Sequence, residues 1–156
     1  MENFWQKLTK PIYALAPMAG VTDSPFRQIC KSFGADLVYS EVASAAGLAH
    51  QPQKTLRMLA STAVEAPYII QLFGSRPDDF AQAARLLTDE QQVAKLGISN
   101  YRLPQGIDIN LGCPVPKVTK QTAGVALFKN LPLAKAVIKR VIEQTDLPVS
   151  IKIRCQ

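Results

Sequence analysis

The sequence predicts an α/β protein whose core is a sheet of about five parallel strands with intervening helices. Segments with strand-like and helix-like patterns alternate along the 156 residues. This alternation is typical of right-handed βαβ units, in which a helix joins two parallel strands. Hydrophobic residues make up 47% of the chain and charged residues 19%, as expected for a globular protein. Gly and Pro residues separate many of the segments and mark their ends.

Three strands are predicted in the first half of the chain, and each is a short apolar run. They cover residues 12–16, 37–39 and 67–73, of which the first ends at Pro17 and the third at Gly74. Short apolar runs bounded by turn residues are typical of buried strands.

Two longer helices are predicted beside these strands. The first begins at Asp23-Ser24-Pro25, where a capping residue precedes a proline in the first turn, and it ends at Gly34. The second begins at Ser75-Arg76-Pro77-Asp78, with acidic residues where the helix dipole favours them. Residues 42–62 are expected to form a loop and short helical pieces. Apolar spacing predicts the inner faces of the two helices, which are Phe26, Ile29, Cys30 and Phe33 in the first and Phe80, Ala83, Ala84 and Leu87 in the second.

The second half of the chain continues the alternation. Residues 89–105 are polar and irregular, and we expect them to extend the preceding helix and then form a loop. A fourth strand is predicted at 106–111 and a fifth at 148–153. Between them a helix opens at Asn130-Leu131-Pro132, and its predicted inward residues are Leu133, Val137, Val141 and Ile142.

The composition excludes several classes of protein. The three cysteines have no paired spacing and the single histidine has no obvious partner, which argues against a disulfide framework and a metal site. No apolar run reaches the roughly 18 residues that a membrane span needs, and the N-terminus lacks the apolar core of a signal peptide. We therefore expect a cytoplasmic protein that binds neither a membrane nor a metal.

The formal net charge of +6 favours a polyanionic partner. Transfer RNA, other RNA and DNA all fit this charge, and a solvated cationic face would give the same composition. The sequence contains neither GxGxxG nor GxxxxGK[ST], so it lacks the signatures of dinucleotide-binding and P-loop folds.

The most informative stretch is Asp108-Ile109-Asn110-Leu111-Gly112-Cys113-Pro114. An alternating apolar strand ends here at Gly112, and a thiol follows on a turn that Pro114 prevents from continuing as a strand. The carboxyl ends of parallel strands are where α/β barrels carry their chemistry. Taken alone, the motif fits a catalytic Cys113 and a structural one equally well.

Other polar or unusual residues are predicted at the same edge of the sheet, at the ends of the remaining strands. Each has a simpler interpretation: Gln71 could satisfy a buried backbone group, Lys152 could extend outward at a rim, and Met18 could fill the core. No base lies beside Cys113, which disfavours a cysteine–histidine hydrolase. An amide, a lysine and backbone groups around one site suit a planar heterocycle such as a flavin. The set comprises Pro17, Met18, Ala19, Gly20, Ser40, Glu41, Gln71, Asn110, Cys113, Lys152 and Arg154.

These motifs together resemble the tRNA-dihydrouridine synthases, in order and spacing and over nearly the whole chain. The combination of APMAGVTD with DINLGCP is highly specific. The matching stretches are Ala16–Arg27 (APMAGVTDSPFR), Ser40-Glu41, Gln71–Gly74 (QLFG), Asp108–Pro114 (DINLGCP), Lys117-Val118, Ala123-Gly124 and Lys152–Arg154 (KIR).

The resemblance implies a chemistry and a role for each site residue. Members of that family are FMN enzymes that reduce the C5–C6 double bond of selected tRNA uridines and use NADPH to reload the flavin. Cys113 matches the general acid that protonates C5, and Asn110 is expected to help place the uracil. The expected flavin contacts are Pro17, Met18 and Ala19 in a loop against the ring, and Gln71 and Lys152 at its edge. The target uridine would have to be turned out of the tRNA into the pocket.

The resemblance also implies a TIM barrel followed by a small helical domain. A complete (β/α)8 barrel typically needs about 250 residues. We therefore expect residues 1–156 to be the N-terminal part of the FMN-binding domain, an incomplete barrel that lacks the flavin phosphate site and the helical tRNA-binding domain. Because an open sheet edge and an apolar face would be exposed, we expect the isolated chain to bind FMN poorly and to have little or no activity. No oligomeric state is predicted.

Two alternatives stay open at this point. One is another FMN-dependent barrel oxidoreductase, of the dihydroorotate dehydrogenase type, that acts on a free pyrimidine. The other is a non-catalytic half-barrel that binds RNA.

Overall fold

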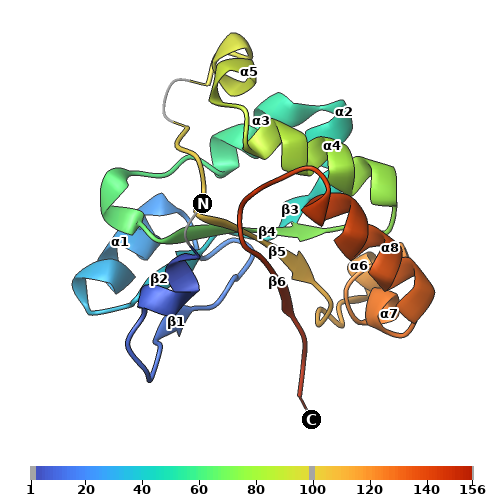
Figure 1. Ribbon diagram of the computed structural model, residues 1–156, viewed down its shortest axis with the longest axis horizontal. Helices are drawn as coiled ribbons and strands as arrows, with labels where there is room; N and C mark the ends of the chain where they lie inside the picture. The colour runs from blue at the N-terminus through green and yellow to red at the C-terminus, as the bar shows by residue number, and fades with distance from the viewer. Residues whose placement is uncertain (1–2, 99–100, 156) are drawn as a thin grey trace.

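The computed structural model describes residues 3–98 and 101–155, and its centre is one parallel sheet. Five strands follow one another in the order β1-β2-β4-β5-β6, and the short β3 pairs with the end of β4. This is a half-barrel of parallel strands with helices outside it, which confirms the predicted incomplete TIM-barrel class (Figure 1). The strands are β1 (Ala14–Leu15), β2 (Leu37–Tyr39), β3 (Ala43–Ser44), β4 (Tyr68–Phe73), β5 (Gly106–Asn110) and β6 (Val149–Lys152).

Several helices, α1 and α8 among them, begin at capping side chains that satisfy free backbone N–H groups. Asp23 accepts a hydrogen bond from the Phe26 N–H at the start of α1, and Asn130 accepts one from the Leu133 N–H at the start of α8, as predicted. The helical elements are η1 (Phe4–Lys7), α1 (Ser24–Ser32), α2 (Ala45–His50), α3 (Pro52–Met58), η2 (Ala63–Glu65), α4 (Pro77–Leu87), α5 (Glu90–Lys95), α6 (Pro116–Thr119), α7 (Val125–Phe128) and α8 (Leu131–Ile142).

The outer face of the sheet packs against helices. Because side chains alternate between the two faces of a strand, every second residue points outward. The predicted inner face of α4 is confirmed, since all four of its residues are fully buried. Helix α4 in turn packs on α2 and α8. The core between sheet and helices includes Val38, Ile70, Leu72, Ile107 and Ile109 from the strands and Phe80, Ala83, Ala84 and Leu87 from α4.

The inner face of the sheet changes from apolar to polar along the strands. Near the amino ends, Leu37, Tyr39 and Ile69 form a small cluster against the N-terminal segment that contains Phe4 and Trp5. Near the carboxyl ends, the inward positions are polar. The N-terminal segment therefore covers the apolar part of the inner face, and the polar part is left for a site. The inward polar residues are Gln71, Asp108, Asn110, Ser150 and Lys152.

The predicted core face of α1 is wrong at two positions. Ile29 is 53% exposed and Phe33 is 88% exposed, whereas Cys30 is half-buried. The residue that α1 buries completely is Arg27, which pairs with Glu65 of η2. The buried face of this helix therefore carries an ion pair, which apolar spacing does not reveal.

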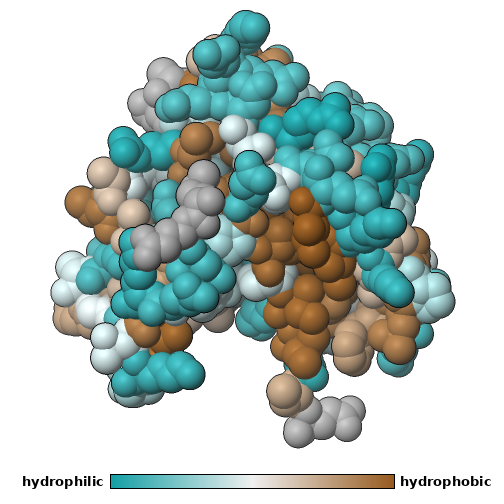
Figure 2. Space-filling model, viewed as in Figure 1, coloured by the Kyte–Doolittle hydropathy of each residue, from teal (hydrophilic) through white to brown (hydrophobic). Residues whose placement is uncertain are grey.

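The last helix also departs from its predicted pattern. Val137 and Val141 are buried, but Ile142 is 55% exposed. Ile151 and Ile153 on and just after β6 are exposed too. Figure 2 shows a continuous apolar strip on this side of the molecule, over β6 and the neighbouring end of α8. The outward residues of β6 therefore differ, since Val149 packs against the core whereas Ile151 is exposed.

Residues 89–98 do not continue the preceding helix, contrary to the prediction, and residues 99 and 100 of the predicted loop lie outside the described residues. Helix α4 ends at Leu87, and Asp89 then caps the separate helix α5 by accepting a hydrogen bond of 2.8 Å from the Gln92 N–H. A short polar side chain such as that of Asp89 bonds backbone N–H groups just ahead of it, which favours the start of a new helix over the continuation of the preceding one. Within 3–98 and 101–155, none of the helices has the length and apolar character needed to cross a bilayer.

Candidate active site

A cavity of about 500 Å³ opens at the carboxyl ends of β4, β5 and β6. It lies in the size range of small-molecule sites. Six of the seven residues predicted from the sequence line it, although they come from four separate segments of the chain. They are Pro17, Ala19, Gln71, Asn110, Cys113 and Lys152, and their neighbours in the wall include Val42, Val115 and Arg154.

A buried hydrogen-bond network forms the floor of this cavity. Asp108 is fully buried, and its two carboxylate oxygens accept hydrogen bonds of 2.7 Å from Gln71 Nε2 and 2.6 Å from Ser150 Oγ. Strand register brings these residues together, because Asp108 lies opposite Gln71 on one side and Ser150 on the other. Asn110 Nδ2 donates to Gln71 Oε1 at 3.2 Å. We call Asp108, Gln71, Asn110 and Ser150 the Asp108 network.

The network continues into the turn that carries the thiol. Asn110 Oδ1 accepts hydrogen bonds from the backbone N–H groups of Gly112 at 3.1 Å and Cys113 at 2.9 Å. An Asn side chain that bonds backbone groups two and three residues ahead stabilises a tight turn. The end of β5 is thereby bent, and Cys113 is half-buried in the wall of the cavity.

The Cys113 backbone is also held from its other side. Val125 N–H donates a 3.0 Å hydrogen bond to the Cys113 carbonyl. Gly124, which precedes Val125, has a φ of +61°, and a Cβ at this position would overlap the same carbonyl oxygen. The Ala123-Gly124 pair of the sequence motif therefore allows α7 to approach the thiol turn closely.

The loop after β1 forms another wall of the cavity. Thr22 is fully buried and its hydroxyl bonds both backbone groups of Met18, donating to the carbonyl at 3.0 Å and accepting from the N–H at 3.1 Å. Gly20, with a φ of +74°, completes the turn and donates to the Glu41 carboxylate. Pro17 and Ala19 reach the cavity, whereas the Met18 side chain is 38% exposed and is not part of its lining.

The electrostatics of the floor follow from its burial. Burial raises the pKa of Asp108, while hydrogen bonds from Ser150 and Gln71 and the positive charge of Lys152 act in the opposite direction. Burial and the nearby Asp108 carboxylate also raise the pKa of Tyr39 to about 12, against a lowering by a hydrogen bond with Ser150. The inner face thus holds a buried acidic group below a cavity whose rim carries Lys152 and Arg154.

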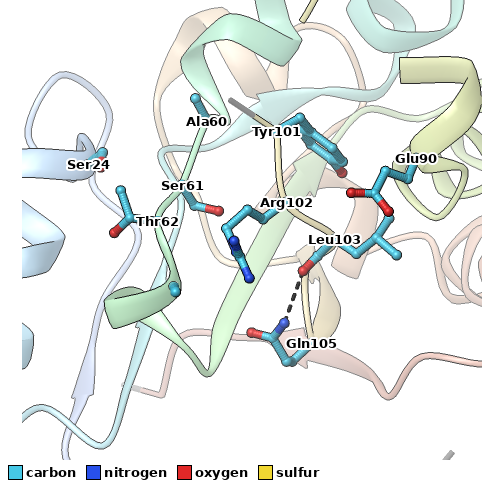
Figure 3. A pocket seen from close by; sticks show the side chains of 10 residues that line it. Ser24, Ala60, Ser61, Thr62, Glu90, Tyr101, Arg102, Leu103 and Gln105 are labelled. Carbon is cyan, nitrogen blue, oxygen red and sulfur yellow. Dashed lines mark hydrogen bonds between the residues drawn. The ribbon is translucent and has the colours of Figure 1, made fainter. Parts of the chain in front are cut away.

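A larger cavity, of about 840 Å³, lies away from these residues (Figure 3). It is bounded by Ser61 and Thr62 on one side and by the segment from Tyr101 to Gln105 on the other, with Arg102 pointing into it. Gln105 joins the amino end of β4, because its Oε1 accepts from the Tyr68 N–H at 2.8 Å. Ligands of parallel α/β sheets bind at the carboxyl ends of the strands, so the smaller cavity is the candidate active site.

The donors in the smaller cavity fit the edge of a flavin ring. Gln71 uses one amide hydrogen for Asp108 and accepts one hydrogen bond from Asn110, which leaves a donor and an acceptor position on the same amide. Lys152 adds an ammonium group that suits a carbonyl edge or a negative charge. In the described residues there is no group of three or more His, Cys, Asp or Glu side chains that could hold a metal ion.

Sequence reasoning did not assign roles to Asp108 and Ser150, although both lie within recognised segments. Each occupies an inward position of an alternating strand, where Ile107 and Ile109 flank Asp108, and Val149 and Ile151 flank Ser150. A carboxylate between two buried isoleucines signals a polar inner face, because charged residues are rarely buried without partners. That signal was present in the sequence.

The chain is similar to proteins of one family. A model of the family described as dihydrouridine synthase (Dus) matches residues 14–156. The chain is 38% identical over 143 residues to tRNA-dihydrouridine synthase B of Shewanella oneidensis, which covers 90% of this chain and 40% of that protein. It is 42% identical over 142 residues to tRNA-dihydrouridine synthase B of Pseudomonas syringae pv. tomato, with 90% and 38% covered. It therefore spans about 40% of the length of these curated relatives.

Proposed function

This chain belongs to the dihydrouridine synthase family, and on that premise we propose that it takes part, in the cytoplasm, in the reduction of uridine to 5,6-dihydrouridine in tRNA. The observation that carries the proposal is the meeting of Cys113, Gln71, Asn110 and Lys152 in one cavity at the carboxyl ends of the strands. The relatives are named as tRNA-dihydrouridine synthases, which gives tRNA as their substrate and dihydrouridine as their product.

We propose FMN as the cofactor of this site and NADPH as its reductant. When bound, FMN would supply hydride chemistry for C6 of the uracil, and NADPH would be the source of that hydride. Gln71 would bind the polar edge of the ring through its remaining donor and acceptor positions. Lys152 would place positive charge at that edge, where it favours the reduced ring. Pro17 and Ala19 would support the ring from the loop after β1.

Cys113 is the proposed catalytic acid. Its thiol proton goes to C5 of the uracil, so that C5 gains a proton, C6 gains a hydride and the double bond between them is lost. The hydrogen bonds that hold the backbone of Cys113 on both sides would keep the sulfur at a fixed height above the cavity floor. Asn110, beside this turn, would help to place the uracil against the thiol.

The net charge of +6 suits the phosphates of a tRNA. Lys117 lies on α6 and Lys120 is the residue that ends this helix, shortly after the Cys113 turn, and both are exposed. We propose that they contact tRNA phosphates beside the turned-out uridine.

The test uses two samples, the 156-residue chain and a chimera in which it replaces the aligned segment of the Shewanella oneidensis relative. Each is titrated with FMN and then assayed with NADPH and tRNA that lacks dihydrouridine. We expect the chimera to form dihydrouridine, and the isolated chain to bind FMN poorly and to have little or no activity.

Substitution in the chimera tests the residue roles. Cys113→Ala should abolish dihydrouridine formation while NADPH still reduces the bound flavin, and Cys155→Ala, at an exposed cysteine, is the matched control. A chimera that binds no FMN, or a Cys113→Ala variant with unchanged turnover, would contradict the proposal.

A further inference from the structure

We propose that Asp108 is a positioning residue of this site: its carboxylate fixes the direction of the Gln71 and Asn110 amides and, through Asn110, steadies the turn at Cys113. The inference rests on the proposed function only in naming a flavin as the ligand of Gln71. The hydrogen bonds that carry it belong to the chain itself.

The directions of the hydrogen bonds carry the argument. A carboxylate can only accept and a backbone N–H can only donate. Asp108 therefore requires the nitrogen of the Gln71 amide, which turns the Gln71 oxygen toward Asn110 Nδ2. At the other end, the N–H groups of Gly112 and Cys113 require the oxygen of the Asn110 amide. Because both ends allow one direction only, turning over the Gln71 amide breaks two hydrogen bonds and turning over the Asn110 amide breaks three.

Burial makes this arrangement costly to disturb. Asp108 is fully buried, with 0% of its surface exposed to solvent, and Gln71 and Asn110 are 2% and 8% exposed. Among the described residues, no buried side-chain nitrogen or oxygen lacks a hydrogen-bond partner. A variant that removes the Asp108 acceptor leaves a buried amide hydrogen without a partner, and the network must rearrange or admit water.

The first test follows the two amides by NMR in the isotope-labelled chain. In the wild type, the side-chain amide protons of Gln71 should exchange slowly with solvent. Asp108→Leu should increase the exchange rate of these protons and shift the backbone N–H of Cys113. Asp108→Asn offers an oxygen to Gln71 and should restore the Cys113 signal. Ser150→Ala removes the other partner of Asp108 and should leave the Cys113 signal in place.

Thiol chemistry gives a second readout. The alkylation rates of Cys113 and Cys155 are measured in the same sample by peptide mass spectrometry, with the exposed Cys155 as internal reference. Asp108→Leu should increase the Cys113 rate severalfold and leave the Cys155 rate unchanged, and Asp108→Asn should return the Cys113 rate toward the wild-type value. Fast exchange of the Gln71 amide in the wild type itself would overturn the inference without any variant.

Cofactor binding in the chimera tests the link between Asp108 and the ligand. Asp108→Leu should weaken FMN binding about tenfold, as expected for one lost hydrogen bond to a charged partner. In a Gln71→Ala background, the same substitution should cost little more, because Asp108 acts through Gln71. Additive losses would overturn the inference. A chain with the NMR signature that binds no FMN in the chimera would instead refute the proposed function and leave the positioning role of Asp108 intact.

Discussion

The buried ion pair between α1 and η2 gives the sharpest stability prediction. Arg27 and Glu65 are both fully buried, and Arg27 Nε donates to Glu65 Oε2 at 2.5 Å. The other oxygen of Glu65 accepts from Ser24 Oγ at 2.7 Å and from the N–H and hydroxyl of Thr62 at 2.7 and 3.0 Å. Every position around the carboxylate is occupied by a donor. Glu65→Gln replaces one acceptor oxygen with an NH₂ group, which must face a donor whichever way the amide turns.

The expected loss of stability depends on the contacts that Arg27 retains in the Glu65→Gln variant. Its guanidinium still donates to the carbonyls of Thr22 and Ala60, each at 2.7 Å, and it still lies 4.6 Å from the Tyr68 ring centroid. Removing one partner of a buried pair costs about 3–5 kcal/mol. Because these contacts compensate part of the charge, we expect Glu65→Gln to lower the free energy of unfolding by about 3 kcal/mol, the lower end of that range.

Urea denaturation followed by circular dichroism measures this change. Glu143→Gln is the matched control, because Glu143 is half exposed and its ion pairs with Lys139 and Arg140 lie at 3.8 and 3.4 Å. Surface pairs of this kind contribute about 0–1 kcal/mol. The reasoning is refuted if Glu65→Gln and Glu143→Gln destabilise the chain equally. Since Arg27 also holds the carbonyl of Thr22, whose side chain fixes the Met18 turn, a confirmed effect would link this pair to the cavity wall.

Three further predictions concern the site and its surroundings. Gly124→Ala should shift the NMR signals of the Cys113 backbone and lower the free energy of unfolding by more than the roughly 1–2 kcal/mol of left-handed backbone strain. Gly97→Ala, at a residue with a φ of +76° and open space around it, should cost only that strain. Equal effects of the two variants on the Cys113 signals would contradict the packing argument. Because the folded-state pKa of Tyr39 is raised to about 12 from 10.0, its contribution to stability should be complete below pH 10 and lost as pH rises toward 12, and Tyr39→Phe should remove that loss from the stability curve. Asp108→Asn should lower the Tyr39 pKa in an NMR titration, and an unchanged value would exclude the Asp108 charge as a cause. In the chimera, tRNA affinity should fall steeply as the salt concentration rises. The combined Lys117→Gln and Lys120→Gln variant should show a shallower salt dependence than the control Lys54→Gln, which changes a lysine on α3, far from the Cys113 turn in the sequence.

Local sequence signals predicted the five main strands and the starts of α1, α4 and α8. Capping residues such as Asp23 and Asn130 act within their own helix, so their effect can be recognised without tertiary information. The error on α1 occurred where partners are distant in sequence, whereas the start of α5 at Asp89 was a local signal that the prediction missed. Arg27 and Glu65 are separated by 38 residues, and they are buried together while Ile29 and Phe33 are exposed despite their helical spacing. No single-helix pattern contains that information.

The same division explains what could be predicted of the site. Cys113, Gln71 and Lys152 were identified because they interrupt apolar strands at their carboxyl ends. The hydrogen bonds among Asp108, Gln71 and Ser150 depend on strand register, which sets residues opposite one another across three strands. Register follows from the assembled sheet, so the network could be described only from the structure.

The Asp108 network also bears on the choice between a catalytic site and a half-barrel that only binds RNA. Burial raises the pKa of Asp108, which means that the folded chain disfavours the charge it holds there. An apolar residue at this inward position would avoid that cost. Phosphate binding by exposed lysines such as Lys117 requires no buried carboxylate and no fixed amide direction. A ligand edge with alternating donors and acceptors does require both, because Gln71 must present its free donor and acceptor positions in one order. The cost of burying Asp108 is therefore better explained by recognition of a polar ring at the cavity floor than by RNA binding alone.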